Sequence, residues 1–306
     1  MGIKYVETIY SPGTAVYKED GIIQRAPFYG VLDGLSAPYS PSHPPILFDG
    51  QTDGEVVVDF IRSQFYNPLL VSVGIKEILI NANQQIAEFH AVLDLNDAGQ
   101  LSGAGLAIAE IGENEISIMQ AGDCFIAAEY QYGMIMTMEN RAYVHDKETN
   151  KLFSQILARY NGDKGAAWDE FVGPLAEMRR QDINVQYAML NGQESFWNCV
   201  QQASWPLAEL ERIMFFTDGF GLPGLNLGDT KFVASLMLSC YNDGSLRGIL
   251  DTVRCNEQTR SSNGHVIAYT LFLFFKNFLR QFLYIRIWTL TGNFKSGFYG
   301  LVNLLV

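Results

Sequence analysis

Short apolar segments that end on an acidic residue recur along the chain. Three segments have this form: FYGVL before Asp33, ISIMQAG before Asp123 and RIMFFT before Asp218. Apolar runs of this length, bounded by glycine, predict buried strands. A carboxylate that follows such a strand lies at the rim of the sheet. We therefore expect three acids from distant parts of the sequence to meet at one edge of a sheet, where their oxygens suit a hard divalent cation.

The remaining pattern alternates short strands with amphipathic helices. Residues 106–137 read as consecutive short strands joined by hairpin turns, which favours antiparallel pairing over βαβ units. Residues 55–66 have helical spacing with a capping box at Thr52, and residues 72–90 form an amphipathic helix that Ser72 would cap. Residues 152–178 have a helical pattern that is interrupted at Asn161-Gly162 and at Gly173-Pro174. Further elements are expected as helices over 231–240 and 245–254, and as strands over 5–32, 183–190, 211–217 and 266–275.

Composition limits the classes of partner and the compartment. The 306 residues carry a net charge of −12, which argues against nucleic acid as the main partner, because phosphate contacts need clustered Lys and Arg. The four cysteines form no close pairs, and the N-terminal residues have no signal-peptide apolar core, so we expect a cytoplasmic protein. The sequence does not indicate an oligomeric state.

The C-terminal residues 276–306 differ from the rest of the chain. From residue 258 onwards there is no Asp or Glu, while five Lys or Arg side chains remain. No stretch in 276–306 reaches the roughly 18 apolar residues of a spanning helix. We interpret the segment as a C-terminal extension that packs on the domain or is poorly ordered. The alternative is a basic, aromatic anchor that associates weakly with a membrane surface.

Five motifs, in order, resemble the metal-dependent PP2C family of serine/threonine protein phosphatases, most closely its divergent bacterial branch. Each is weak alone, but their order and spacing over residues 5–275 match the family. The motifs are FYGVLDG ending at Gly34, the ANxxI-like helix at 81–86, SGAGL at 102–106, AGDC at 121–124 and TDG at 217–219.

This resemblance implies an α+β fold, a four-layer α-β-β-α sandwich in which helices flank two stacked antiparallel sheets. It assigns 1–275 to a phosphatase domain and leaves 276–306 as an extension. The implied reaction is hydrolysis of phosphoserine or phosphothreonine in a phosphoprotein substrate, by a water that bridges two Mn²⁺ or Mg²⁺ ions. Such ions lower the pKa of water and offset charge on the transferring phosphoryl group.

The resemblance also implies a role for each site residue. Asp33 bridges both metals, the Gly34 carbonyl binds one of them, and Asp218 binds the other. Asp123 serves a third, weaker site. Asp20, at the end of Lys18-Glu19-Asp20, binds a metal-bound water.

Three positions depart from the family pattern. Ala15 stands where an arginine often grips the phosphate, and Leu35 stands where a histidine acts as general acid. Asn263 stands where a ligand aspartate is expected, which predicts weaker metal binding. Two other functions remain open: a pseudophosphatase that uses the same fold to bind phosphoproteins or regulate a partner, and a hydrolase for small phosphoesters. Asp33 and Asp218 favour the phosphatase.

Overall fold

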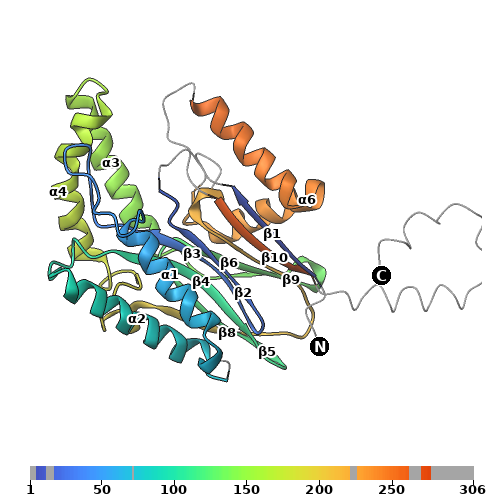
Figure 1. The fold of residues 1–306 in the computed structure, drawn as a ribbon. Helices are drawn as coiled ribbons and strands as arrows, with labels where there is room; N and C mark the ends of the chain where they lie inside the picture. Colours follow the sequence, from blue (N-terminus) through green and yellow to red (C-terminus); the bar gives the residue numbers. More distant parts are fainter. Residues whose placement is uncertain (1–4, 12–16, 71, 221–225, 262–269, 277–306) are drawn as a thin grey trace, which may run out of the picture.

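Two five-stranded antiparallel sheets, stacked face to face, form the centre of the molecule (Figure 1). The computed structural model describes residues 5–11, 17–70, 72–220, 226–261 and 270–276. The first sheet has the order β2 (Asp20–Arg25), β3 (Phe28–Leu35), β4 (Gly103–Ile111), β5 (Glu115–Ala121) and β8 (Gln201–Pro206). The second has the order β1 (Tyr5–Ser11), β10 (Thr270–Lys276), β9 (Leu210–Phe216), β6 (Phe125–Tyr130) and β7 (Ile135–Thr137).

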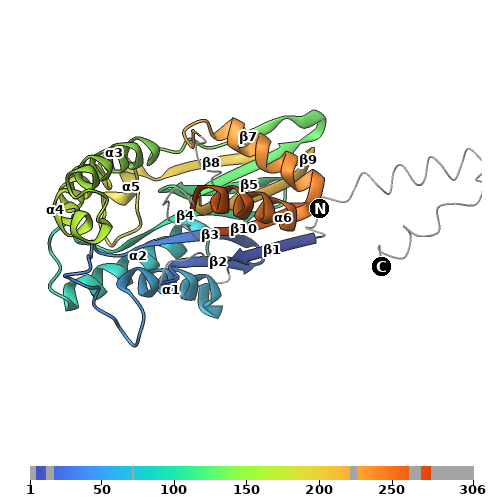
Figure 2. The same ribbon diagram turned by 90° about the horizontal axis from the view of Figure 1, so that it is seen from above.

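Helices cover the outer faces of both sheets, so the α+β sandwich expected from the sequence is confirmed (Figures 1 and 2). The first sheet carries α1 (Asp53–Tyr66) and α2 (Ile75–Val92), and the second carries α6 (Thr230–Ser261). A helical hairpin of α3 (Tyr143–Arg159) and α4 (Lys164–Asp182) lies at one end of the sheets. The short α5 (Phe196–Cys199) precedes β8.

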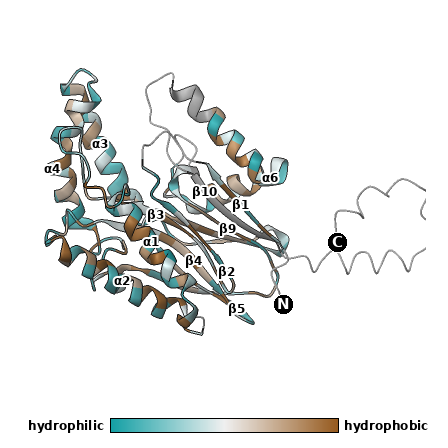
Figure 3. Cartoon of the chain, in the orientation of Figure 1, coloured by the Kyte–Doolittle hydropathy of each residue, from teal (hydrophilic) through white to brown (hydrophobic). Residues whose placement is uncertain are grey.

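The inner strands β3, β4 and β9 are largely apolar because each sheet is buried on both faces. In β3, Val31 belongs to the core between the sheets, while its neighbour Leu32 packs toward α1 and α2. In β9, Phe215 faces the inter-sheet core and Phe216 packs with α6. Successive side chains of a strand point to opposite faces, so a doubly covered sheet needs an unbroken apolar run. The surface helices instead alternate apolar and polar residues (Figure 3).

The starts of the first two helices were predicted with different success. At α1, Thr52 and Glu55 form the expected capping box. At α2 the expected cap at Ser72 is wrong: the helix begins at Ile75, and Gly74 provides no side-chain cap. The Ile75 N–H instead donates to Glu110 Oε2 of β4 at 3.0 Å. A side chain from the sheet thus replaces the local cap, which helical spacing alone does not reveal.

The strand expected over 183–190 is also absent; these described residues make only isolated bridges, Ile183 with Tyr187 and Leu190 with Ala104. Asn184 explains the difference. It has a positive φ of 58°, and its side chain accepts from the Met189 N–H at 2.9 Å and donates to the Met189 carbonyl at 3.0 Å. These hydrogen bonds close a loop at the position where a strand would have paired with its neighbour.

Two helical regions divide where glycine interrupts the pattern. The helical region over 152–178 is two helices, α3 and α4, separated as expected at Asn161 and Gly162, both with positive φ. The interruption expected at Gly173-Pro174 is wrong, because α4 continues through both residues. The helix α6 contains non-helical backbone at Gly244 and Ser245, between the two helices predicted there. None of the helices in the described ranges is long and apolar enough to cross a bilayer. The extension 276–306 lies, apart from Lys276, outside those ranges.

We expect Glu110→Ala to destabilise the protein by about 1 kcal/mol, as loss of a helix cap does. Glu110→Gln should cost less, because the amide oxygen still accepts from Ile75. Urea unfolding of both variants measures the difference, with Glu113→Ala in the exposed turn after β4 as the control. A Glu110→Ala variant no less stable than the control would show that the contact does not cap α2.

Candidate metal centre

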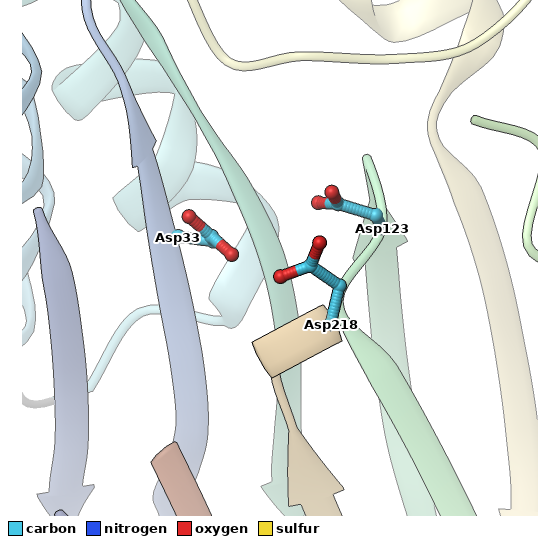
Figure 4. A group of neighbouring side chains, drawn as sticks. All are labelled: Asp33, Asp123 and Asp218. Atoms are coloured by element: carbon cyan, nitrogen blue, oxygen red, sulfur yellow. The ribbon is translucent and has the colours of Figure 1, made fainter. Parts of the chain in front are cut away.

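Three aspartates from separate strands converge at one edge of the stacked sheets. Asp33 lies in β3, Asp123 in the turn between β5 and β6, and Asp218 immediately after β9. One carboxylate oxygen from each lies within 4.8 Å of the others. Figure 4 shows the three side chains pointing toward a common space. The convergence expected from the strand pattern is present, and it brings together acids from both sheets.

Strand pairing places a fourth acid beside them. Asp20 of β2 is the direct partner of Asp33 in the antiparallel register. The Oδ2 atom of Asp20 is buried and has no hydrogen-bond partner. A buried carboxylate oxygen without a donor is costly, unless a cation or an ordered water provides the missing interaction.

Two glycines make room for the cluster. A side chain at Gly105, which pairs with Asp33 across β3 and β4, would stand 3.3 Å from Asp123 Oδ1. Gly122 turns the chain into Asp123 with a φ of +67°, and its N–H donates to the Ala188 carbonyl at 2.8 Å. The turn that presents Asp123 therefore depends on a residue without a Cβ.

The electrostatics of the cluster oppose its ionisation. Burial, followed by the neighbouring carboxylates, raises the pKa of Asp33 and that of Asp218 well above the usual range. Burial and the charges of Asp123 and Glu19 raise the pKa of Asp20 to about 7. Among the described residues, no Lys or Arg forms an ion pair with these acids. A set of half-buried oxygen donors with uncompensated negative charge fits a divalent cation.

A fifth acid, Asp146 near the start of α3, was not anticipated from the sequence. Burial, then the charges of Asp123 and Asp218, raises its pKa to about 8. No motif marks Asp146, because it reaches the site through the packing of the α3–α4 hairpin rather than through strand pairing. Its only sequence signal is an acid in the first turn of a helix, which is common for other reasons.

A cavity of about 260 Å³ opens from the acids toward this hairpin. Arg179 of α4 is the one Arg or Lys that lines it among the described residues. Its Nη1 donates to the Ser36 carbonyl at 2.7 Å, and burial lowers its pKa without neutralising so strong a base. The remaining lining is partly acidic and partly apolar, and includes Asp33, Gly34, Asp123, His145, Asp146, Phe153, Trp168 and Phe171.

The other predicted site residues are placed as follows. Gly34 lines the cavity next to Asp33, and its N–H donates to the Glu19 carbonyl at 3.0 Å. Leu35 also lines the cavity, so no histidine occupies that position. Asn263 lies outside the described residues, as does Ala15.

We expect Gly122→Ala to destabilise the protein by roughly 2 kcal/mol or more, because it adds a strained positive φ to a steric clash. Its Cβ would lie 2.8 Å from the Gly105 Cα. Gly133→Ala is the matched control, since Gly133 has a φ of +75° with no atom within 4 Å of the added Cβ. Chemical unfolding should show a larger loss of stability for Gly122→Ala than for Gly133→Ala, and Mn²⁺ titration should show a larger loss of affinity. Equal losses in the two variants would contradict the close approach of Gly122 to Gly105.

The metal-free protein should lose stability as the pH rises from about 4 to about 8. Asp20 has a folded pKa of about 7 against an ordinary 3.8, so in this window the folded state holds more protons than the unfolded state. The free energy of unfolding then falls with pH. In a chelator, we expect the melting temperature to drop by roughly 5 °C or more between pH 5 and pH 8, and Mn²⁺ to restore it.

The control for this experiment is Asp218→Asn, which removes one charge from the cluster and should reduce the drop. A melting temperature that is constant or rises over the window would show that the acids do not repel one another in the folded protein.

The chain is similar to known proteins in its structure but not in its sequence. No protein-family model and no curated protein sequence matches the chain. Among solved structures, the chain is similar to the catalytic domain of the serine/threonine phosphatase PstP in complex with two manganese ions (TM-score 0.53, 12% identity, 89% of this chain and 97% of that chain). It is also similar to Stp1 from Staphylococcus aureus (0.51, 13%, 91% and 96%).

A third similar structure is PppA, described as a key regulatory component of the T6SS in Pseudomonas aeruginosa (TM-score 0.53, 14% identity, 90% of this chain and 99% of that chain). At identities this low, the structural similarity establishes the fold alone. The chain has the fold of the bacterial PP2C-type serine/threonine phosphatases, as the sequence motifs predict.

Proposed function

We propose that the protein is a metal-dependent phosphatase that hydrolyses phosphoserine and phosphothreonine in proteins. The observation that carries this proposal is the cluster of Asp33, Asp123 and Asp218, with oxygens within 4.8 Å of one another, at the sheet edge of this fold. Such a cluster does not stabilise the fold, because repulsion among its carboxylates lowers the stability of the metal-free protein.

Two Mn²⁺ or Mg²⁺ ions, when bound, would lower the pKa of water and offset the phosphoryl charge. Asp33 would hold both ions, the Gly34 carbonyl would hold one of them, and Asp218 would hold the other. Asp123 would serve a third and weaker site. The neutral amide of Asn263, in place of a carboxylate, would reduce the affinity of its site without abolishing it.

The remaining groups would orient and neutralise the reactants. Asp20, with an unpartnered buried oxygen, would accept a hydrogen bond from the attacking water. The Arg179 side chain has a single described hydrogen bond, to the Ser36 carbonyl, so other N–H groups of its guanidinium are available to phosphoryl oxygens. The cavity gives a substrate side chain access to these groups. We place this activity in the cytoplasm, which the spacing of the cysteines favours.

We expect Asp33→Asn and Asp218→Asn each to lower Mn²⁺-dependent phosphate release from a phosphothreonine peptide by at least about 100-fold, since each removes a charged ligand. Their melting temperatures in a chelator should equal or exceed that of the unmodified protein, because a repelling charge is lost. Asp59→Asn is the control: this exposed acid of α1 pairs with Arg62, away from the cluster.

Full activity in either cluster variant would contradict the proposal. Activity toward p-nitrophenyl phosphate but toward no phosphopeptide would favour a hydrolase of small phosphoesters. Phosphopeptide binding without Mn²⁺-dependent turnover in the unmodified protein would identify a pseudophosphatase.

A further inference from the structure

A histidine–aspartate pair lies beside the cluster and joins the two helices of the hairpin. His145 lies in the first turn of α3, and Asp182 is the last residue of α4. The His145 Nδ1–H donates to Asp182 Oδ2 at 2.7 Å, and the two side chains are only 8% and 14% exposed. The Gln186 side chain donates to the other oxygen, Asp182 Oδ1, at 2.8 Å. Both oxygens of the carboxylate are thus engaged, which fixes its orientation.

This arrangement commits one imidazole nitrogen and leaves the other for a ligand. With Nδ1 bonded to Asp182, the Nε2 atom has no protein partner among the described residues. The ring is held on a second side by Tyr187, whose ring centroid is 5.2 Å away. His145 lines the same cavity as Asp33 and Asp123. Its charge also acts on Asp123, whose pKa it lowers against the larger effect of burial.

Hydrolysis of a seryl or threonyl phosphate creates a need that the metal ligands do not meet. The departing oxygen is a poor leaving group unless it receives a proton as the bond to phosphorus breaks. The carboxylates that would hold cations are not available as acids. Asp146, the other carboxyl group that lines the cavity, has no side-chain partner among the described residues to orient it as Asp182 orients His145. Leu35 is apolar, and Arg179 holds its protons too firmly to release one.

We propose that His145 is the general acid of this reaction and that Asp182 is its positioning residue. This inference rests on the proposed function. The oxygen of the attacking water forms a bond to phosphorus, and the bond from phosphorus to the seryl oxygen breaks. The proton on Nε2 of the imidazolium passes to the seryl oxygen. The neutral imidazole keeps its Nδ1–H on Asp182 and takes up from the solvent a proton equivalent to the one that the water has lost.

A purely structural role for the pair predicts something different. As a link between α3 and α4, it would support the hairpin, and its loss would affect all substrates alike. The chain offers a matched control in Arg159 and Glu170, an ion pair that also joins α3 to α4 but is more exposed and does not line the cavity.

The test compares substrates that differ in their need for an acid. We expect His145→Gln to lower kcat for phenyl phosphate and for a phosphoserine peptide by about 100-fold or more, the usual contribution of a general acid. With p-nitrophenyl phosphate, whose leaving group departs without a proton, kcat should change less than about threefold. Asp182→Asn should show the same selectivity to a smaller extent. Glu170→Gln should leave the ratio between substrates unchanged.

Each other result overturns the inference. Equal losses on all three substrates would assign the pair a structural role, and no loss with phenyl phosphate would place the acid elsewhere. If His145→Gln does not fold, as judged by circular dichroism, the substrate ratio for Asp182→Asn decides between these outcomes. Failure of the proposed function is distinguishable, because then the unmodified protein would release no phosphate from the phosphoserine peptide in Mn²⁺, whatever its activity on the two small substrates.

Discussion

Mutual repulsion among half-buried carboxylates is the constraint on which the rest of this molecule depends. Asp20, Asp33, Asp123 and Asp218 meet at a half-buried edge of the sheets, and the charges of neighbouring carboxylates add to burial in raising the pKa values of Asp20, Asp33 and Asp218. Only a rigid frame holds such groups together, and two sheets buried on both faces provide it. The frame contributes stability through its three apolar layers, and the acids reduce that stability until cations neutralise them.

The sheets carry the three aspartates proposed as cation ligands, whereas the helical hairpin carries most of the groups proposed to meet the substrate. His145, Asp146 and Arg179 all come from α3 and α4 and reach the cavity from the side opposite the strands. The aromatic residues Phe153 and Trp168 continue the same wall. Changes in this hairpin would therefore alter the wall of the cavity while leaving the three aspartates of the cluster in place.

The sequence allowed most of the strands and the three converging acids to be predicted, because both follow from local rules; β8 (Gln201–Pro206) was not expected. A doubly buried strand needs an apolar run, and an acid beside glycine at its end lies at the sheet rim. Asp20 was different: its own neighbours suggest an exposed turn, and only the family motif marked it. The structure explains its position by its pairing with Asp33 across β2 and β3.

The residues that sequence reasoning missed are brought to the site by helix packing. His145 and Arg179 have no distinctive neighbours in the sequence, and nothing in a helical pattern tells which polar residue meets a cavity. Non-local hydrogen bonds also explain the two incorrect elements: Glu110 caps α2 from a strand, and Asn184 closes a loop where a strand was expected. Only tertiary contacts determine these features.

Anomalous diffraction at the manganese edge, from crystals grown with MnCl₂, tests the central claim most directly. If the acids form a metal centre, the anomalous map will show two strong peaks, each within bonding distance of a carboxylate oxygen of Asp33 or Asp218. Manganese bound elsewhere, or no peak at the cluster in a protein that still releases phosphate in Mn²⁺, would contradict the assignment of these acids as the metal centre.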